Sequence, residues 1–260
     1  MARGKRILIM GLPGAGKTTL TEQVISLMGP KNVTWFNADR VREEYEDWDF
    51  SPEGRERQAK RMAQMSEVVA SNGTHVICDF VCPTEELREM FNADITIWVD
   101  TIEKGRYNDT NLLFQKPKKC DLRLTEWDHS NPYKVEQLIT PYVWDNKAPT
   151  VQMLGRWQPW HKGHQTLFEE SLNRAGQVQI MVRDVQGVDG KNPFDFDFVK
   201  SRIIDALSPL YGDRFRIIQV PNITNIVYGR DVGYKIEEVV LPKEIQEISA
   251  TKIRKEMGIG

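Results

Sequence analysis

The chain has 260 residues, 40% of them hydrophobic, which suits one large or two modest globular domains. Its 35 lysines and arginines are balanced by 37 acids, so nothing in the charge suggests a nucleic-acid partner. No apolar run approaches the ~18 residues of a membrane span, and no signal-peptide core is visible. We therefore expect a cytoplasmic protein with no membrane partner, and the sequence gives no indication of its oligomeric state.

The first strong pattern is an apolar run over residues 7–10, which predicts a buried strand. A stretch of the form Gly-x4-Gly-Lys-Thr follows, and residues at helical spacing come next. This strand–loop–helix order is that of the phosphate-binding P-loop, where backbone amides and a helix N-terminus surround phosphate oxygens. We expect Lys17 to reach the β- and γ-phosphates of ATP and Thr18 to hold Mg²⁺. The predicted ATP-binding residues are Gly11, Gly14, Ala15, Gly16, Lys17, Thr18 and Thr19.

The rest of the first half alternates between strand and helix patterns. Strands are predicted over 33–36, 75–78 and 95–99, and helices over 51–71 and from Thr84 onward. This alternation predicts a doubly wound α/β fold, in which a parallel sheet carries helices on both faces.

Polar residues follow the second predicted strand, in the stretch Asn37-Ala-Asp39-Arg-Val-Arg42. Ligands of open α/β sheets bind at the carboxyl ends of the strands, so Asp39 and Arg42 should project toward the phosphates. An acid at this place can orient Mg²⁺ or accept a proton from the acceptor's hydroxyl, and an arginine can hold an anionic acceptor. The pattern favours a kinase that acts on a small molecule.

A basic segment follows at 104–119, with five lysines and arginines against one acid. Two interpretations stay open for this segment. It is either a lid that closes over phosphates or an ordinary solvated loop.

The segment 144–149 is the best candidate for a linker, and we predict domains at 1–147 and 148–260. The second domain repeats the strand–helix alternation on a smaller scale, which predicts a Rossmann-like fold. Its strands are predicted at 150–154, 178–183 and 214–220, and its helices at 164–175, 195–207 and from Ser249 to Met257.

Two histidines stand in the stretch Gly155-Arg-Trp-Gln-Pro-Trp-His161-Lys-Gly-His164, at a predicted strand-to-helix junction. Imidazoles beside a helix N-terminus can donate hydrogen bonds to an α-phosphate and stabilise charge that develops there. A second stretch, Ile248-Ser-Ala-Thr-Lys-Ile-Arg254, opens the last predicted helix, and its hydroxyls and cations suit β- and γ-phosphates. The predicted nucleotide-binding residues are Gly155, Arg156, Trp157, His161, His164, Ser249, Thr251, Lys252 and Arg254.

The first half resembles the adenylylsulfate kinase family over roughly residues 5–102. That family carries Asp-Gly-Asp-x-Val-Arg after its second strand and then Phe-Ser-x-x-x-Arg, which Asn37–Arg42 and Phe50–Arg55 match. The resemblance implies that Phe50 stacks on the acceptor's adenine and that Arg42 and Arg55 hold its phosphosulfate. It places Asn37 and Gln58 beside the acceptor as well.

One departure from this family concerns catalysis. Its first acid, which is implicated in catalysis or magnesium binding, is Asn37 in this chain. Asparagine cannot act as a general base, so Asp39 would have to suffice. The acceptor could then be a different anion or a 5′-hydroxyl, and a nucleotide-binding regulator with a degenerate kinase site is a further alternative.

The second half resembles the nucleotidyltransferase superfamily with His-x-Gly-His and Ile-Ser-x-Thr-x-Ile-Arg motifs. The resemblance implies that His161 and His164 stabilise the α-phosphate, while Ser249, Thr251 and Arg254 bind the rest of the triphosphate. An anionic acceptor would attack directly and expel pyrophosphate. We expect ATP as the donor, with nicotinamide mononucleotide-like adenylyl transfer and cytidylyl transfer left open. The whole chain is thus predicted to be a bifunctional, Mg²⁺-dependent kinase and nucleotidyltransferase.

Overall fold

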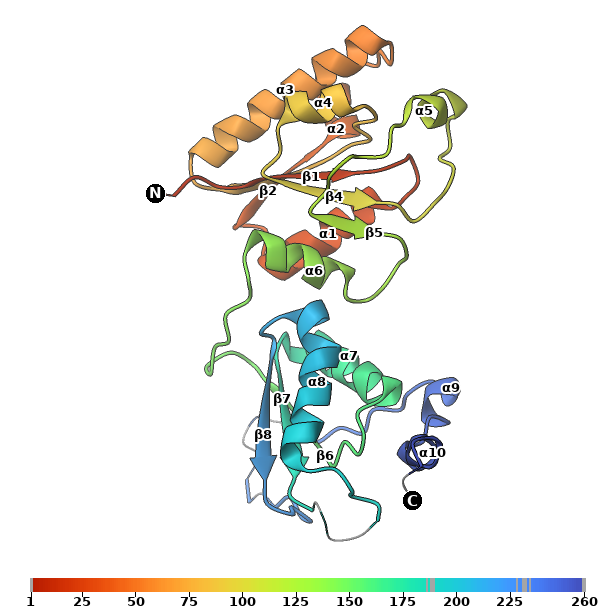
Figure 1. Cartoon of the computed structure of the whole chain (residues 1–260). Coiled ribbons are helices and arrows are strands. Elements are labelled where there is room, and N and C mark those ends of the chain that lie inside the picture. Colours follow the sequence, from red (N-terminus) through yellow and green to blue (C-terminus); the bar gives the residue numbers. More distant parts are fainter. Residues whose placement is uncertain are drawn as a thin grey trace. The chain divides into compact units, whose positions relative to one another are not determined.

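The computed structural model describes residues 2–185, 187, 190–227, 229–230, 233 and 235–258. The chain divides into two compact units, Met1–Pro141 and Tyr142–Gly260 (Figure 1). The segment that follows Pro141 is held to the second unit by Gln177, whose buried side chain accepts from the Tyr142 hydroxyl and from the Asp145 amide. The division therefore comes six residues before the boundary at 147 predicted from the sequence, and the assignment of functions to the two parts stays a prediction.

The first unit is built on a parallel five-stranded sheet in the order β2-β3-β1-β4-β5. Its strands are β1 (Arg6–Met10), β2 (Val33–Asn37), β3 (His75–Asp79), β4 (Ile95–Val99) and β5 (Leu122–Leu124). This order brings the carboxyl ends of β1, β2 and β3 together at one edge, where the candidate site lies.

Helices cover both faces of this sheet, as Figure 1 shows. They are α1 (Lys17–Met28), α2 (Ala38–Glu44), α3 (Pro52–Ser71), α4 (Glu85–Phe91), α5 (Asn108–Leu113) and α6 (Asn131–Ile139). Side chains alternate along β1, so Leu8 and Met10 pack in the core under α2, α3 and α4, whereas Ile7 and Ile9 pack in the core beside α1 and α6. The predicted α/β architecture of the first half is confirmed.

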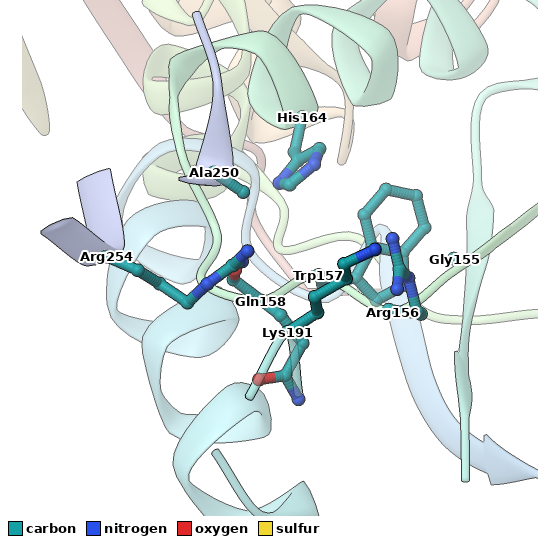
Figure 2. A pocket seen from close by; sticks show the side chains of 8 residues that line it. All are labelled: Gly155, Arg156, Trp157, Gln158, His164, Lys191, Ala250 and Arg254. Carbon is teal, nitrogen blue, oxygen red and sulfur yellow. The ribbon is translucent and has the colours of Figure 1, made fainter. Parts of the chain in front are cut away.

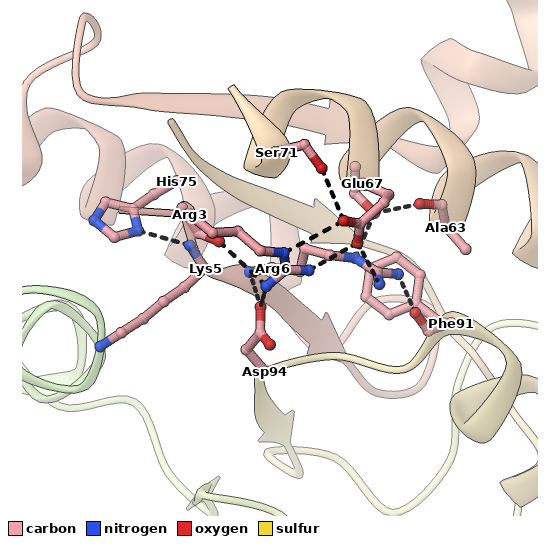
Figure 3. Close-up of polar contacts among 11 residues, drawn as sticks. Arg3, Lys5, Arg6, Ala63, Glu67, Ser71, His75, Phe91 and Asp94 are labelled. Atoms are coloured by element: carbon pink, nitrogen blue, oxygen red, sulfur yellow. Dashed lines mark hydrogen bonds and ion pairs between the residues drawn. The ribbon is translucent and has the colours of Figure 1, made fainter. Parts of the chain in front are cut away.

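At the amino end of β1, Arg6 is buried and joins the sheet to the helices (Figure 3). Its Nε donates to Ser66 Oγ of α3 over 3.0 Å, and its Nη2 donates to the Phe91 carbonyl of α4. Arg3 pairs nearby with Glu67 at 2.7 Å and with Asp94 at 2.9 Å. Since this network lies at the end of β1 away from the glycine-rich loop, it fixes the sheet without occupying the site.

The second unit contains a smaller parallel sheet in the order β6-β7-β8. Phe168 of α7 packs against Tyr211 of α8 and Phe215 of β8, with ring centroids 5.1 and 5.9 Å apart. The predicted Rossmann-like identity of this unit stays a prediction. The elements are β6 (Val151–Gly155), α7 (Lys162–Ala175), β7 (Val178–Arg183), α8 (Phe196–Tyr211), β8 (Phe215–Val220), α9 (Lys243–Gln246) and α10 (Ala250–Glu256).

Two local features differ from the sequence prediction. Strand β2 passes directly into α2, because the Asn37 side chain accepts from the Asp39 and Arg40 amides and so caps the helix. Helix α8 continues through Pro209 to Tyr211, which is buried and bonded to Glu169. Among the described residues, no helix is long and apolar enough to cross a membrane.

Candidate functional site

The glycine-rich loop joins β1 to α1 in the first unit. Gly16 has a φ of +94°, and a Cβ at this position would clash with the ring of Trp127, so only glycine fits. It occupies the N-cap position of α1 without a side-chain cap, which leaves the start of the helix open to an anion. Gly11, Gly14 and Ala15 complete the turn, and the exposed Thr19 lies in the first turn of α1.

Lys17 lies at the start of α1, and its Nζ donates to the Leu12 carbonyl over 3.1 Å. Burial lowers the pKa of this ammonium group, an effect that the negative charges of Asp79 and then Asp39 oppose. The lysine is thus held across the loop, with its charge beside the place where phosphates would bind.

The carboxylate that contacts Thr18 belongs to Asp79, a residue that the sequence analysis did not select. Thr18 Oγ1 donates to Asp79 Oδ2 over 2.8 Å. Asp79 is only 2% exposed, and burial raises its pKa, while hydrogen bonds from Trp35, Thr18 and Asn37 act in the opposite direction. The sequence does contain a signal for it, because an acid directly follows the predicted strand 75–78. The observed strand β3 includes this acid as its last residue.

Asn37 and Asp39 lie close together but have different environments. Asn37 Nδ2 donates to both carboxylate oxygens of Asp79, over 3.0 and 3.1 Å, and lies 3.5 Å from Thr18 Oγ1. Asp39 is exposed in the first turn of α2. Its predicted roles in catalysis and in metal binding stay predictions.

The segment expected to bind the acceptor exposes an aromatic ring between two arginines. Phe50 is 50% exposed, and the guanidinium carbons of Arg42 and Arg55 lie 4.6 and 5.7 Å from its ring centroid. Arg42 itself is buried, and its Nη1 donates to the Asp47 and Asp49 carbonyls.

Gln58, also predicted to bind the acceptor, is buried and donates to the Ala38 carbonyl. Arg42 and Gln58 therefore shape this segment in the structure, and direct contact with an acceptor stays a prediction for both.

The basic segment 104–119 contains the short helix α5 and reaches both parts of the site. Arg55 Nη2 pairs with Asp109 of α5 at 3.0 Å, which links the segment to the acceptor side. The Arg106 side chain lies against Gly14 of the loop, since a Cβ there would be 3.3 Å from its Nε. A lid remains a prediction, but the segment is positioned beside both halves of the expected site.

In the second unit the two histidines form the start of α7. His161 is the N-cap residue, and its Nδ1 accepts from the Gly163 amide over 3.1 Å. The His161 and His164 rings stack with centroids 3.6 Å apart, and Trp157 meets His164 edge-on at 4.9 Å. Burial, and then the proximity of His161, lower the pKa of His164 to about 3, so its imidazole is neutral at pH 7.

A pocket of about 200 Å³ brings the two predicted motifs of the second half together (Figure 2). Arg254 of α10 is buried, and its Nη1 donates to the Gln158 carbonyl over 2.6 Å, across 96 positions of sequence. The Trp157 ring lies over Gly155, where a Cβ would come within 2.6 Å of it. The lining residues are Gly155, Arg156, Trp157, Gln158, His164, Lys191, Ala250 and Arg254.

The remaining predicted residues of this half lie in or next to α10, and the pocket also contains one lysine that the sequence did not predict. Ser249 occupies the N-cap position of α10, and Thr251 Oγ1 accepts from Arg254 over 3.2 Å. Lys252 is exposed. Lys191 lines the pocket but was not predicted, because no spacing connects it to either motif.

The first unit matches known kinases. Residues 3–128 match the family model described as adenylylsulphate kinase. A protein of Aeropyrum pernix named "Probable adenylyl-sulfate kinase" is 35% identical over 91 residues, which are 34% of this chain and 50% of that protein. The adenylyl-sulfate kinase of Bacillus pumilus is 26% identical over 123 residues, 46% of this chain and 56% of that protein.

Solved structures are also similar to about half of this chain. The APS kinase CysC of Mycobacterium tuberculosis, described in complex with AMPPNP and APS, is 22% identical and covers 54% of this chain and 97% of its own, with a TM-score of 0.45. Shikimate kinase from Acinetobacter baumannii is 16% identical and covers 52% and 93%, with a TM-score of 0.38. The chain spans about half the length of the curated relatives above. Its N-terminal part is an adenylylsulfate kinase-like P-loop kinase domain, whereas the family match ends at residue 128 and leaves the second unit outside it.

Proposed function

We propose that the first unit transfers the γ-phosphoryl group of ATP to a hydroxyl of an anionic nucleotide such as adenylylsulfate. The observation that carries this proposal is the P-loop together with Phe50, exposed between two arginines, in a part of the chain that matches adenylylsulfate kinases. A planar ring flanked by guanidinium groups suits an acceptor with both a base and a negative charge.

In the proposed reaction the acceptor's hydroxyl oxygen forms a bond to the γ-phosphorus, ADP leaves, and the hydroxyl proton passes to a carboxylate. Asp39 is the proton acceptor proposed from the sequence. Lys17 and the amides at the start of α1 hold the phosphates, and Arg55 holds the acceptor's anionic group.

Mg²⁺ would neutralise charge on the transferred phosphoryl group. The oxygens of Thr18 and Asp79, 2.8 Å apart, fit the hard oxygen ligands that this ion prefers. The described part of the chain contains no cluster of three or more metal-binding side chains, and a Mg²⁺ ion that is held mainly by phosphates and water needs none.

Acceptor specificity tests this function directly. Wild-type protein with Mg²⁺ and radiolabelled ATP should phosphorylate adenylylsulfate in preference to adenosine and other neutral nucleosides. Phe50→Ala should raise the KM for the acceptor by ~10-fold with a much smaller change for ATP, since one stacked base contributes ~1–3 kcal/mol. Val68→Ala, at an exposed position on α3, is a control outside the site. A clear preference for neutral nucleosides would contradict the proposal.

We further propose that the second unit transfers a nucleotidyl group, with ATP as the expected donor. The observation that favours this is the pocket formed jointly by the two motifs, with three cationic side chains from separate segments and a neutral histidine on its wall. An oxygen of an anionic acceptor would attack the α-phosphorus and displace pyrophosphate. His164 would donate a hydrogen bond to the charge that develops there, and Arg156, Lys191 and Arg254 would hold the remaining phosphates.

Product analysis separates the alternatives for this unit. The protein is incubated with ATP or CTP, Mg²⁺ and a panel of anions that includes sulfate, nicotinamide mononucleotide and sugar phosphates. Mass spectrometry should detect one new nucleotide conjugate and an equal amount of pyrophosphate. A protein that binds nucleotide but yields no product with any acceptor would instead be a nucleotide-binding regulator.

A further inference from the structure

Gln158 lies in the wall of the second unit's pocket, between β6 and α7 (Figure 2). It is 3% exposed, and both ends of its side-chain amide bond to the backbone of one other residue. Nε2 donates to the Phe194 carbonyl over 2.7 Å, and Oε1 accepts from the Phe194 amide over 3.0 Å. The side chain thus pairs with Phe194 as a peptide group of a neighbouring strand would, and its removal would leave two backbone groups without these partners.

Phe194 belongs to a stretch whose position is not determined by regular secondary structure. Residues 190–195, all of them described, form neither helix nor strand. The stretch carries Lys191, which is exposed and lines the pocket, and the buried Asn192, whose Oδ1 lies 3.5 Å from Arg156 Nη1. The two bonds to Phe194 therefore fix this stretch to the pocket wall close to its lysine.

The main chain of Gln158 holds a second cation of the pocket. Its carbonyl accepts from Arg254 Nη1 over 2.6 Å, and Arg254 is buried. Arg156, Lys191 and Arg254 line the same pocket, where their like charges repel one another. The oxygens that accept from Arg156 and Arg254, those of a side-chain amide and of a main-chain carbonyl, are neutral, so these contacts leave the positive charges uncompensated.

We propose that Gln158 is a positioning residue of this site: its amide holds residues 190–195 so that Lys191 meets the phosphates of the bound nucleotide. Gln158 then acts on the nucleotide through Lys191, because both polar atoms of its side chain are engaged with Phe194. This inference rests on the proposed nucleotidyl transfer, because it assumes that a nucleoside triphosphate occupies the pocket. It explains the place of Lys191, which belongs to neither sequence motif.

Two other roles for Gln158 lead to different expectations. If its amide bound the nucleotide directly, the effect of its loss would add to that of losing Lys191. If it only stabilised the second unit, its loss would lower the free energy of unfolding and leave the affinity for ATP unchanged.

A double-mutant cycle separates these roles by binding alone. In the full chain, the NMR signal of the His164 Cε1 proton is followed during titration with ATP and Mg²⁺, because His164 lines the pocket and the chain has 4 histidines. The proteins are wild type, Gln158→Met, Lys191→Ala and the double variant Gln158→Met/Lys191→Ala. Methionine is unbranched like glutamine but carries no amide, so it fills the space without the two bonds.

We expect Lys191→Ala to raise the Kd for ATP ~10-fold, the usual effect of losing one bond to a charged group, and Gln158→Met to raise it nearly as much. The double variant should bind at most about twofold more weakly than Lys191→Ala, since the glutamine has little to position once the lysine is gone. Gln219→Met, at an exposed position on β8, is the matched control and should keep the wild-type Kd.

Two results would overturn the inference: a Kd for Gln158→Met within about twofold of wild type, or single effects that multiply to ~100-fold in the double variant. Either result in a protein that releases pyrophosphate with an acceptor removes the inference alone. The expected cycle in a protein that releases no pyrophosphate removes only the proposed nucleotidyl transfer. A His164 signal that moves with neither ATP nor CTP removes both.

Should Gln158→Met not fold, Gln158→Asn takes its place in the cycle. Asparagine keeps a neutral amide but is one methylene group shorter, so it no longer spans both backbone groups of Phe194. Circular dichroism of each variant checks the fold. A Gln158→Asn protein that binds ATP as wild type does, or in which Lys191→Ala still has its full ~10-fold effect, overturns the inference.

Discussion

The candidate sites of the two units differ in their charged and aromatic groups. In the first unit, the charged groups of Lys17 and Asp79 lie at the carboxyl ends of the neighbouring strands β1 and β3, and the Thr18 hydroxyl donates to Asp79. In the second unit, the stacked imidazoles of His161 and His164 lie at the start of α7, and the rings of Trp157 and Trp160 pack against His164. Arg254 of the last helix lines the same pocket. The first candidate site thus combines fully charged side chains, whereas the second holds a neutral imidazole among aromatic rings.

This difference has a mechanistic consequence. Burial among Trp157, Trp160 and His161 keeps His164 uncharged, so it can donate a hydrogen bond without carrying a charge that would have to be solvated. Full positive charge in that pocket comes from arginine and lysine. The two sites should therefore respond independently to substitution and differently to pH.

The largest effect should come from Lys17→Ala. Lys17 is expected to contact phosphate oxygens, so its loss should lower the rate of phosphoryl transfer by ~10³-fold. The fold should persist without its bond to the Leu12 carbonyl. Lys31→Ala, an exposed lysine of the same unit, is the matched control. The rate is measured with radiolabelled ATP and adenylylsulfate. Transfer at an undiminished rate in Lys17→Ala would remove this residue from the site.

His164→Ala tests the independence of the two units from the other side. It should lower pyrophosphate release by ~10²–10³-fold, with a smaller change in nucleotide affinity, because one preorganised donor is lost while Arg254 and Thr251 remain. Phosphoryl transfer in the first unit should stay unchanged. Loss of both activities would contradict the assignment of two independent sites, and an unfolded second unit would make the histidine pair structural.

Much of the first unit could be predicted because its signals are local. The P-loop, the strands and the long helix α3 follow from spacing, caps and glycines within a few residues. Asp79 was missed because its importance depends on the strand order, which places β3 between β2 and β1. No spacing along the chain shows that residues 37 and 79 face each other.

The second unit shows the same limit. Both motifs were visible in the sequence, but the bond between Arg254 and Gln158 and the place of Lys191 in the pocket depend on tertiary packing. The linker is a further example. Polar and proline residues predicted a connection at 144–149, whereas the division into units lies at Pro141, and the contacts of Gln177 attach the segment after it to the second unit.

A fragment that begins at Tyr142 should therefore be more stable than one that begins at Ala148. The longer fragment keeps the bonds from Tyr142 and Asp145 to Gln177, whereas the shorter one leaves a buried amide oxygen without those donors. Such a loss costs ~1–3 kcal/mol. Urea unfolding of both fragments measures the difference, and Tyr142→Phe in the longer fragment isolates the hydroxyl. Equal stability would show that residues 142–147 do not belong to the second unit.

A further predicted effect is a pH dependence confined to the second unit. The pKa of His164 is about 3 in the folded protein, while an unfolded histidine has a pKa of ~6.5, so the unfolded chain binds a proton first as the pH falls. The stability associated with the neutral ring is present above pH ~6.5 and is lost toward pH 3, by at most ~1.4 kcal/mol per pH unit. Between pH 7 and pH 5 the loss should be ~2 kcal/mol.

The comparison with His164→Asn isolates this contribution, since the amide does not titrate and all other groups remain. Urea unfolding at pH 7 and pH 5, followed by tryptophan fluorescence in the fragment that begins at Tyr142, should show the extra loss with His164 alone. The Cε1 proton of His164 should also keep its chemical shift from pH 8 to pH 5 in NMR spectra. His161 stacks on the His164 ring, and Arg156, Lys191 and Arg254 line the same pocket. The cations among these groups disfavour a positive charge on His164. A shift with a midpoint near pH 6.5 would mean that the imidazole is solvated and charged in mild acid, and the contrast between a charged first site and a neutral second site would fail.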